Sequence, residues 1–286
     1  MQTINQLVSL REAVDALKNG GKSVALVPTM GALHEGHLTL VREAARRADH
    51  VIVSIFVNPR QFGPNEDLDA YPRRLAADAA LLEAEGVALL WAPTVDQMYP
   101  QGYATNVSVS GVSEVACGAA RPGHFDGVAT VVCKLFNQVR PDIALFGEKD
   151  WQQLAVIRRM ARDLDLTQPH ADAIIGVETV REPSGLAMSS RNQYLTDAQR
   201  EQAAGLSAAM TSAIAAIEDG ADVGGTLAFM KAQVLAAGFT SIDYADLRDA
   251  DTLETLSSFI GQPARLLVAA RIGGTRLIDN MPLGRR

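Results

Sequence analysis

The stretch Val27-Pro28-Thr29-Met30-Gly31-Ala32-Leu33-His34-Glu35-Gly36-His37 decides the fold of this chain. A short apolar run, residues 24–27, precedes it and has the length of a buried strand. Apolar residues then recur at helical spacing through a charged background, at Leu38, Val41, Ala45 and Ala48. The stretch is therefore predicted to form the turn between a strand and a helix.

The residues of this turn favour an anion site. Gly31 and Gly36 allow the backbone to bend tightly and to approach a ligand closely. His37 falls near the helix start, where free N–H groups and the helix dipole favour an anion, and His34 adds a second imidazole. We interpret the pair as a phosphate site. Two alternatives stay open: half of a metal site, since imidazole is a common ligand, or a capping role on the surface.

The composition is that of a globular protein with a sizeable core. The chain has 286 residues, of which 48% are apolar, enough for one large or two smaller domains. A net charge of −7 argues against a general nucleic-acid binder, although a nucleotide needs only a local basic patch. Cys117 and Cys133 do not make a disulfide framework and are predicted to be buried free thiols.

The chain shows no targeting or membrane segment. Residues 1–5 lack a basic start followed by an apolar region, so no signal peptide is predicted. No apolar run approaches the roughly 20 residues that are needed to span a bilayer. We expect a cytoplasmic protein with no membrane partner.

Strands and helices alternate over the first part of the chain. Helices are predicted at residues 7–18, from 38 onward, and at 74–85, 130–139 and 151–163. Strands are predicted at 24–27, 51–57, 87–91, 143–146 and 177–180. Near-continuous apolar strands suit a parallel sheet that is covered on both faces. The pattern predicts an α/β fold, a Rossmann-like doubly wound parallel sheet.

A second, smaller α+β domain is predicted after a boundary near residue 176, giving domains 1–176 and 177–286. Thr196 and Gln199 form a plausible capping box, followed by a helix that ends at residue 218 and a second helix at 222–236. A strand is predicted at 242–247. The segments 265–272 and 275–280 flank Gly273-Gly274, which is typical of a two-residue hairpin turn.

Polar loops that contain glycine follow four of the predicted strands, at residues 28–37, 58–63, 147–150 and 181–192. Ligands of doubly wound sheets sit beyond the carboxyl ends of the strands, so these loops are expected to converge on one edge. Lys149 offers a point charge for phosphate oxygens. Taken alone, it would equally be a solvated strand end.

Other loop residues also have two interpretations each. Ser189, Ser190 and Arg191 suit a polyphosphate, or form an ordinary capped turn. Gln61 and Gln153 both donate and accept, which suits a substrate with hydroxyls and a carboxylate, although either alone would be an exposed polar residue. The segment 121–127 is either a mobile lid or a structural turn, and Asp78 is expected on a solvated helix face.

Five motifs, in order, closely resemble the pantothenate synthetase family: residues 28–37, 58–62, 121–125, 147–150 and 188–192. The His-x-Gly-His element alone indicates only the wider nucleotidyltransferase superfamily. The resemblance implies a two-step ligase in which (R)-pantoate attacks the α-phosphate of ATP and β-alanine then attacks the pantoyl adenylate. It also implies Mg²⁺ with ATP, and a homodimer formed through the N-terminal domain.

The resemblance also implies roles for individual residues. His34 and His37 would bind the ATP phosphates, with His37 as the proton donor. Asn58, Gln61 and Gln153 would hold pantoate, and Gln61 also β-alanine. Lys149, Ser189 and Arg191 would join the two histidines in catalysis. The remaining ATP contacts would be Met30, Gly31, Ala32, Leu33, Glu35, Gly36, Gly147, Glu148, Asp150, Val180, Met188 and Ser190.

The metal is the weakest part of the resemblance. The acidic candidates of the family lie around Asp78, but the neighbouring position in this chain is Ala77, so Asp78 is only a weak candidate ligand. Mg²⁺ would then be held mostly by phosphates and water, as this ion often is.

Three other functions compete with this hypothesis. A plain nucleotidyltransferase would move AMP onto a phosphate ester, but the Gln61 and Gln153 pair argues against the cationic acceptor pocket it needs. A fragment of a class I aminoacyl-tRNA synthetase disagrees with the acidic charge. A non-catalytic nucleotide sensor would bind ATP without releasing pyrophosphate.

Overall fold

The structure, a computed structural model, describes residues 1–64 and 66–284, which form two compact units. Unit 1 comprises Met1–Ser113, Arg121–Gly147 and Gln153–Glu178. Unit 2 comprises Glu114–Ala120, Glu148–Gln152 and the chain from Thr179 onward. The single domain boundary near residue 176 stays a prediction. No helix among the described residues is both long and apolar enough to cross a bilayer.

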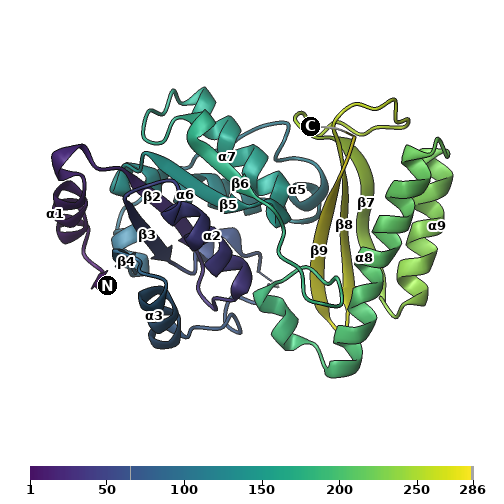
Figure 1. Cartoon of the computed structure of the whole chain (residues 1–286), viewed down its shortest axis with the longest axis horizontal. Helices are drawn as coiled ribbons and strands as arrows, with labels where there is room; N and C mark the ends of the chain where they lie inside the picture. Colours follow the sequence, from purple (N-terminus) through teal and green to yellow (C-terminus); the bar gives the residue numbers. More distant parts are fainter. Residues whose placement is uncertain (65, 285–286) are drawn as a thin grey trace. The chain divides into compact units, whose positions relative to one another are not determined.

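Unit 1 is built on a parallel sheet that confirms the doubly wound prediction (Figure 1). Over the described residues its strand order is β1-β4-β3-β2-β5-β6, and every neighbouring pair is parallel. The strands are β1 (Gln2–Ile4), β2 (Val24–Thr29), β3 (His50–Ile55), β4 (Leu89–Trp91), β5 (Ile143–Gly147) and β6 (Ile174–Val177). The strand predicted at 177–180 is therefore wrong, and the edge strand β1 was not predicted.

Helices cover both faces of this sheet, as its buried central strands require. They are α1 (Leu7–Leu17), α2 (Glu35–Ala45), α3 (Leu75–Ala84), α4 (Val95–Met98), α6 (His124–Val139) and α7 (Trp151–Asp163), with short 3-10 turns η1 (Asn19–Gly21), η2 (Pro59–Gln61) and η4 (Ala171–Ala173). Helix α6 begins six residues before the predicted start at residue 130. Val27, Val41, Leu82 and Leu145 belong to one buried cluster that joins the strands to α2 and α3.

The strand order places the loop after β2 at the switch point of the sheet. From β2 the chain proceeds through β3 to β4 on one side, and β5 and β6 then continue on the other side of β2. A crevice for ligands opens at the carboxyl ends of strands where the order reverses in this way. The histidine stretch is thus at the position in the fold where a nucleotide is expected.

Unit 2 contains an antiparallel sheet of β7 (Ser241–Asp249), β8 (Ala264–Ile272) and β9 (Thr275–Leu283), which confirms the predicted α+β character. Helices α8 (Asp197–Glu218) and α9 (Val223–Ala236), α5 (Ala116–Ala120), and the 3-10 turns η3 (Glu148–Asp150) and η5 (Ser190–Tyr194) complete the unit. The capping box of Thr196 and Gln199 is present. The hairpin also forms, because Gly273 and Gly274 both adopt positive φ, 53° and 83°.

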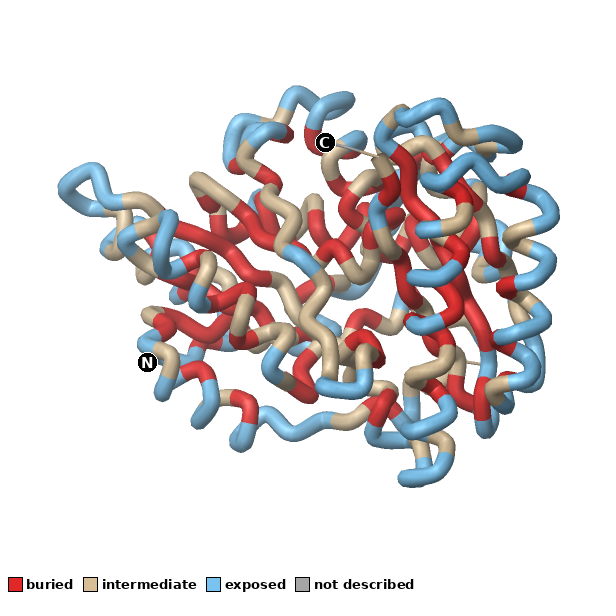
Figure 2. The backbone as a smooth tube through the Cα atoms, turned by 45° about the vertical axis from the view of Figure 1, so that its right-hand side comes forward, coloured by how far each residue is buried: buried red, intermediate tan, exposed pale blue. Residues whose placement is uncertain are grey.

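The two faces of this small sheet carry different partners. Leu277 and Met281 of β9 pack with the cluster that includes α8 and α9. Side chains alternate along a strand, so Arg276 and Asn280 leave from the other face. There Arg276 reaches Cys117 of α5, and Asn280 reaches the backbone of η3. Figure 2 shows buried residues concentrated along the strands, with exposed residues on the outer turns of helices and on loops.

Helix α6 approaches the turn η2 so closely that only glycine fits at their crossing. A Cβ atom on Gly127 would overlap the carbonyl group of Arg60 and would lie 2.7 Å from the backbone nitrogen of Gln61. These neighbours are backbone atoms, which cannot move aside as a flexible side chain can. The position of Gln61 is therefore set by a helix that follows it by more than 60 residues in the sequence.

We expect Gly127→Ala to lower the free energy of unfolding by about 1–3 kcal/mol, because overpacking against backbone forces both elements apart. Urea unfolding measures this change. The matched control is Gly63→Ala, whose new Cβ would make only ordinary contacts of 3.7 Å or more with the Glu66 side chain. Equal stability of the two variants would show that the contact between α6 and η2 is not tight.

Candidate active site

The loop after β2 begins with a tight, internally bonded turn. The hydroxyl of Thr29 donates to the carbonyl of Ser54 on β3 (2.9 Å) and accepts from the N–H of Gly31 (3.2 Å). Gly31 has φ 83°, and Ala32 also lies in the left-handed region with φ 51°. Such a backbone is unfavourable for alanine, so another group must stabilise it.

That group is the carboxylate of Asp78 on α3. Its Oδ2 accepts from the N–H of Ala32 and its Oδ1 from the N–H of Leu33, each at 2.9 Å. The Asp78 residue is only 2% exposed. The expected solvated helix face is therefore wrong: both oxygens are buried and clamp the histidine loop. Among residues 1–64 and 66–284, no group of three or more His, Cys, Asp or Glu is arranged to hold a metal ion.

His34 and His37 form a reciprocal cap at the start of α2. The N–H of Gly36 donates to Nδ1 of His34 (3.2 Å), and the N–H of His34 donates to Nδ1 of His37 (3.3 Å). A nitrogen that accepts a hydrogen bond carries no proton, so the proton of each neutral ring is on Nε2. Both imidazoles, with ring centroids 4.1 Å apart, are thus held as N–H donors at a helix N-terminus. The capping and phosphate hypotheses are compatible.

Asn58 is the buried centre of the loop after β3. It is 1% exposed, and its Nδ2 donates to Oε1 of Gln61 (3.1 Å) and to the carbonyl of Gly127 (3.0 Å). Its Oδ1 accepts from the hydroxyl of Tyr99 (2.9 Å). Burial raises the pKa of Tyr99 to about 12, so this hydroxyl remains a donor at neutral pH. Gly127 and Tyr99 thus fix the amide of Asn58, which in turn orients the amide of Gln61.

Gln61 joins the loops after β2 and β3. Its Nε2 lies 2.8 Å from Sδ of Met30, and its backbone carbonyl accepts from Nδ1 of His124 (2.8 Å). Arg121 contacts Nε2 of His124 (3.1 Å) and forms an ion pair with Glu66 (2.5 Å). Burial opposes ionisation of Glu66, but Arg121 outweighs it and holds the pKa of Glu66 below its usual value. Segment 121–127 is therefore a structural turn that supports Gln61.

The other predicted residues of unit 1 lie around the end of β5. Gly147 is the last residue of that strand, and Gln153 is half-buried in the first turn of α7. Unit 1 therefore holds the loops after β2 and β3 and the carboxyl end of β5 at one edge of its sheet, because these three strands are adjacent. The structure joins the first two loops directly, through Gln61 and Met30.

The predicted nucleotide residues Glu148, Lys149 and Asp150 form the turn η3 in unit 2. The buried carboxylate of Glu148 pairs with Arg265 (2.6 Å). The Lys149 ammonium group lies 3.8 Å from Oδ2 of Asp150, and its side chain is 18% exposed. Of the three, Lys149 is the cation, and it carries its charge at the end of a long aliphatic side chain.

The predicted loop 180–191 is folded back on itself within unit 2. The N–H of Met188 donates to the carbonyl of Val180 (3.0 Å). The hydroxyl of Ser189 accepts from the N–H of Arg191 (3.3 Å), which caps η5. Buried Asn192 donates to the carbonyl of Ala187 (3.1 Å). The Ser-Ser-Arg stretch is therefore both a capped turn and a set of half-buried donors.

Several supporting residues were missed at the sequence level. No sequence motif points to Tyr99 or Asn280, because each acts through a hydrogen bond to a residue that is distant in the chain. Arg121 and His124 were noticed for their residue types, but their partner is a main-chain carbonyl that no side-chain pattern reveals.

The chain is similar to a family of known enzymes over nearly all its length. The sequence profile of the family described as pantoate-beta-alanine ligase matches residues 2–282. A pantothenate synthetase of Novosphingobium aromaticivorans is 82% identical over 284 residues, covering 99% of each chain.

Solved structures of proteins with these names are similar to the chain over almost its whole length. A pantothenate synthetase from Thermus thermophilus is 45% identical and matches with a TM-score of 0.92 over 100% of both chains. A pantoate-beta-alanine ligase from Francisella tularensis, complexed with beta-gamma ATP and beta-alanine, is 32% identical and has a TM-score of 0.82, covering 98% of this chain and 97% of that one.

We expect Asp78→Ala to destabilise the protein by about 2–5 kcal/mol, because two buried backbone N–H groups lose their acceptor. The change should appear in urea unfolding. The matched control on the same helix is Glu83→Ala. Glu83 makes an exposed ion pair with the N-terminal amine, so this substitution should lower the free energy of unfolding by at most about 1 kcal/mol. A tolerated Asp78→Ala would show that the histidine loop does not depend on this carboxylate.

Proposed function

The chain belongs to the pantoate-beta-alanine ligase family, and on this premise we propose that it condenses (R)-pantoate with β-alanine in an ATP-dependent reaction. The products are pantothenate, AMP and pyrophosphate. The reaction proceeds in two steps through a pantoyl adenylate. It is an acid–amino-acid ligation that supplies the precursor of coenzyme A.

One observation carries the assignment of chemistry to this site: the paired histidines at the N-terminus of α2. Their Nδ1 atoms accept from backbone N–H groups, which places the proton of each neutral ring on Nε2 and makes that nitrogen the donor. The helix end adds free N–H groups and a favourable dipole. The pair lies directly after β2, at the switch point of the sheet. This arrangement suits the phosphates of a nucleotide.

In the first step, a carboxylate oxygen of pantoate attacks the α-phosphorus of ATP, and the bond to the β-phosphate oxygen breaks. Pyrophosphate leaves. No protein nucleophile is needed, because the carboxylate of pantoate itself attacks. The protein must align the two reactants and stabilise the charge that grows on the phosphate oxygens. We assign the second task to His34 and His37, with His37 as the proton donor. Asn58, Gln61 and Gln153 hold pantoate.

In the second step, the amine of β-alanine attacks the acyl carbon of the adenylate. The acyl carbon–oxygen bond breaks, AMP leaves, and the amine loses a proton. Gln61 suits the orientation of β-alanine because its backbone and side chain are both fixed, by His124 and by Asn58. A fixed amide can stabilise a developing charge without first reorganising.

Unit 2 contributes further nucleotide contacts in this proposal. Lys149 and Arg191 supply cations, Ser189 and Ser190 hydroxyls, and Val180 a surface for adenine. Glu148 acts indirectly, since its carboxylate is paired with Arg265.

Mg²⁺ is proposed as a companion of ATP. Within the described parts of the chain no group of three or more potential metal ligands forms, and the oxygens of Asp78 already accept two backbone N–H groups. The donor set thus suits an ion that is carried by phosphates and water. A cytoplasmic homodimer that forms through the N-terminal domain completes the proposal, and light scattering after gel filtration would test the dimer.

We expect the wild-type chain to exchange labelled pyrophosphate into ATP only when pantoate is present, and to form AMP only when β-alanine is added. His37→Ala should lower exchange by about 10²–10³-fold, because it removes a donor to the transition-state charge. The matched control is His170→Ala, since His170 is exposed in unit 1 and caps the short turn η4.

Two results would contradict this proposal. Release of pyrophosphate that is indifferent to pantoate would indicate a nucleotidyltransferase with another acceptor. Tight binding of ATP with no turnover would indicate a nucleotide sensor.

A further inference from the structure

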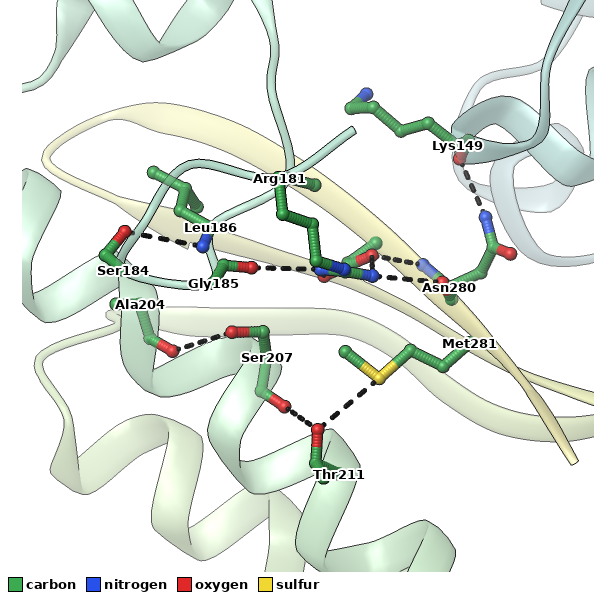
Figure 3. Close-up of polar contacts among 12 residues, drawn as sticks. Lys149, Arg181, Ser184, Gly185, Leu186, Ala204, Ser207, Thr211, Asn280 and Met281 are labelled. Carbon is green, nitrogen blue, oxygen red and sulfur yellow. Dashed lines mark hydrogen bonds and ion pairs between the residues drawn. The ribbon is translucent and has the colours of Figure 1, made fainter. Parts of the chain in front are cut away.

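Two adjacent residues of β9, Asp279 and Asn280, hold the two nucleotide loops of unit 2. Both are buried, 4% and 3% exposed, although polar residues in a strand usually face water. Adjacent side chains leave a strand on opposite faces, so the two residues serve different partners. Figure 3 shows their surroundings.

Asn280 holds the backbone of the turn that carries Lys149. Its Nδ2 donates to the carbonyls of Glu148 and Lys149, both at 2.8 Å. Its Oδ1 accepts from Arg265 (2.8 Å), so both polar atoms of the amide are engaged. In Figure 3 the Lys149 carbonyl faces Asn280, whereas the side chain extends away from it.

Arg265 completes this anchor. Its guanidinium pairs with the carboxylate of Glu148 (2.6 Å) and stacks 3.7 Å from the ring centroid of Trp151, and the indole N–H of Trp151 donates to the carbonyl of Ala250 (3.0 Å). Glu148 and Trp151, which flank Lys149 and Asp150 in the chain, are therefore held in place.

Asp279 holds the second loop from the other face of the strand. Its carboxylate forms a bidentate pair with Arg181 (2.7 and 2.9 Å) and also accepts from the N–H of Asn280 (2.7 Å). Arg181 donates to the carbonyl of Gly185 (3.1 Å) and so closes the turn that leads to Met188–Arg191. Planar two-point contacts of this kind fix orientation as well as distance.

We propose that Asp279 and Asn280 are positioning residues for ATP: Asn280 sets the backbone from which Lys149 reaches the phosphates, and Asp279 sets the loop that presents Ser189 to Arg191. This proposal rests on the proposed function, because it assigns the two loops to a nucleotide. Neither residue is required to touch the substrate. One strand thereby fixes the spacing between the two donor groups.

The test of Asn280 is a double-mutant cycle with Lys149. Asn280→Asp replaces the donor by an oxygen that repels the two carbonyls, and should weaken ATP affinity and raise KM for ATP by about 10–100-fold, since a shift of about 1 Å can cost 10²-fold. KM for β-alanine should stay unchanged. In the Lys149→Ala background, Asn280→Asp should have almost no further effect on ATP, because the group that it positions is gone.

The matching cycle for Asp279 combines Asp279→Asn with Arg191→Ala. Asp279→Asn should weaken ATP binding in the wild-type background and have almost no further effect in the Arg191→Ala background. Val234→Ala is the control for general destabilisation, since it removes buried methyl groups from α9 in the same unit and should leave ATP affinity unchanged. Asn280→Ser, which retains a small polar group, serves if Asn280→Asp does not fold.

Either of two results would overturn the proposal. The first is that the losses of ATP affinity are additive in both cycles. The second is that Asn280→Asp, or its substitute Asn280→Ser, loses no more ATP affinity than Val234→Ala does. ATP affinity is measured without pantoate. A wild-type chain that binds ATP but shows no pantoate-dependent exchange would refute the proposed function alone, because the affinity cycles would still decide the positioning role.

Discussion

The buried carboxylate of Asp78 is the constraint on which the histidine loop depends. It accepts the N–H groups of Ala32 and Leu33, and so stabilises a left-handed backbone at a residue that has a side chain. Charge-assisted hydrogen bonds to main-chain N–H groups are among the stronger ones in proteins. Once the loop has this course, His34 falls at the N-cap of α2 and the two imidazoles cap one another.

At the other loops, too, some residues are assigned to the substrate and others hold the loop in place. Lys149 and Ser189, which are assigned to the nucleotide, are half-buried, whereas Asn280 and Asp279, which hold their loops, are almost fully buried. Asn58 plays this part for Gln61, and Asn280 for the turn at Lys149. Lys149 and Ser189 have to remain partly accessible to a nucleotide, so the positions of their loops are set by buried neighbours.

The sequence was informative where structure is decided locally. The capping box at Thr196 and the Gly273-Gly274 hairpin follow from short-range chemistry, and both form as predicted. The strand at 177–180 was wrong because β-branched residues continue beyond the last parallel pairing of β6, which ends at Val177. Asp78 looked like a surface residue because its partners lie 45 and 46 positions away in the chain. The motif residues themselves could be recognised, but the buried residues that hold them could not.

Polar anchors of this kind have an advantage over apolar packing for an adenylating enzyme. An apolar contact is compatible with many orientations of the side chain. The amide of Asn280, whose donor and acceptor atoms are both hydrogen-bonded, is compatible with only one. The cost of burying such a group is offset only if all its partners are present, so the arrangement is specified as a whole. A site whose donors are already fixed needs little reorganisation when charge develops on a phosphate. In this fold the buried polar residues are therefore as much a part of the proposed chemistry as the groups that contact the substrate.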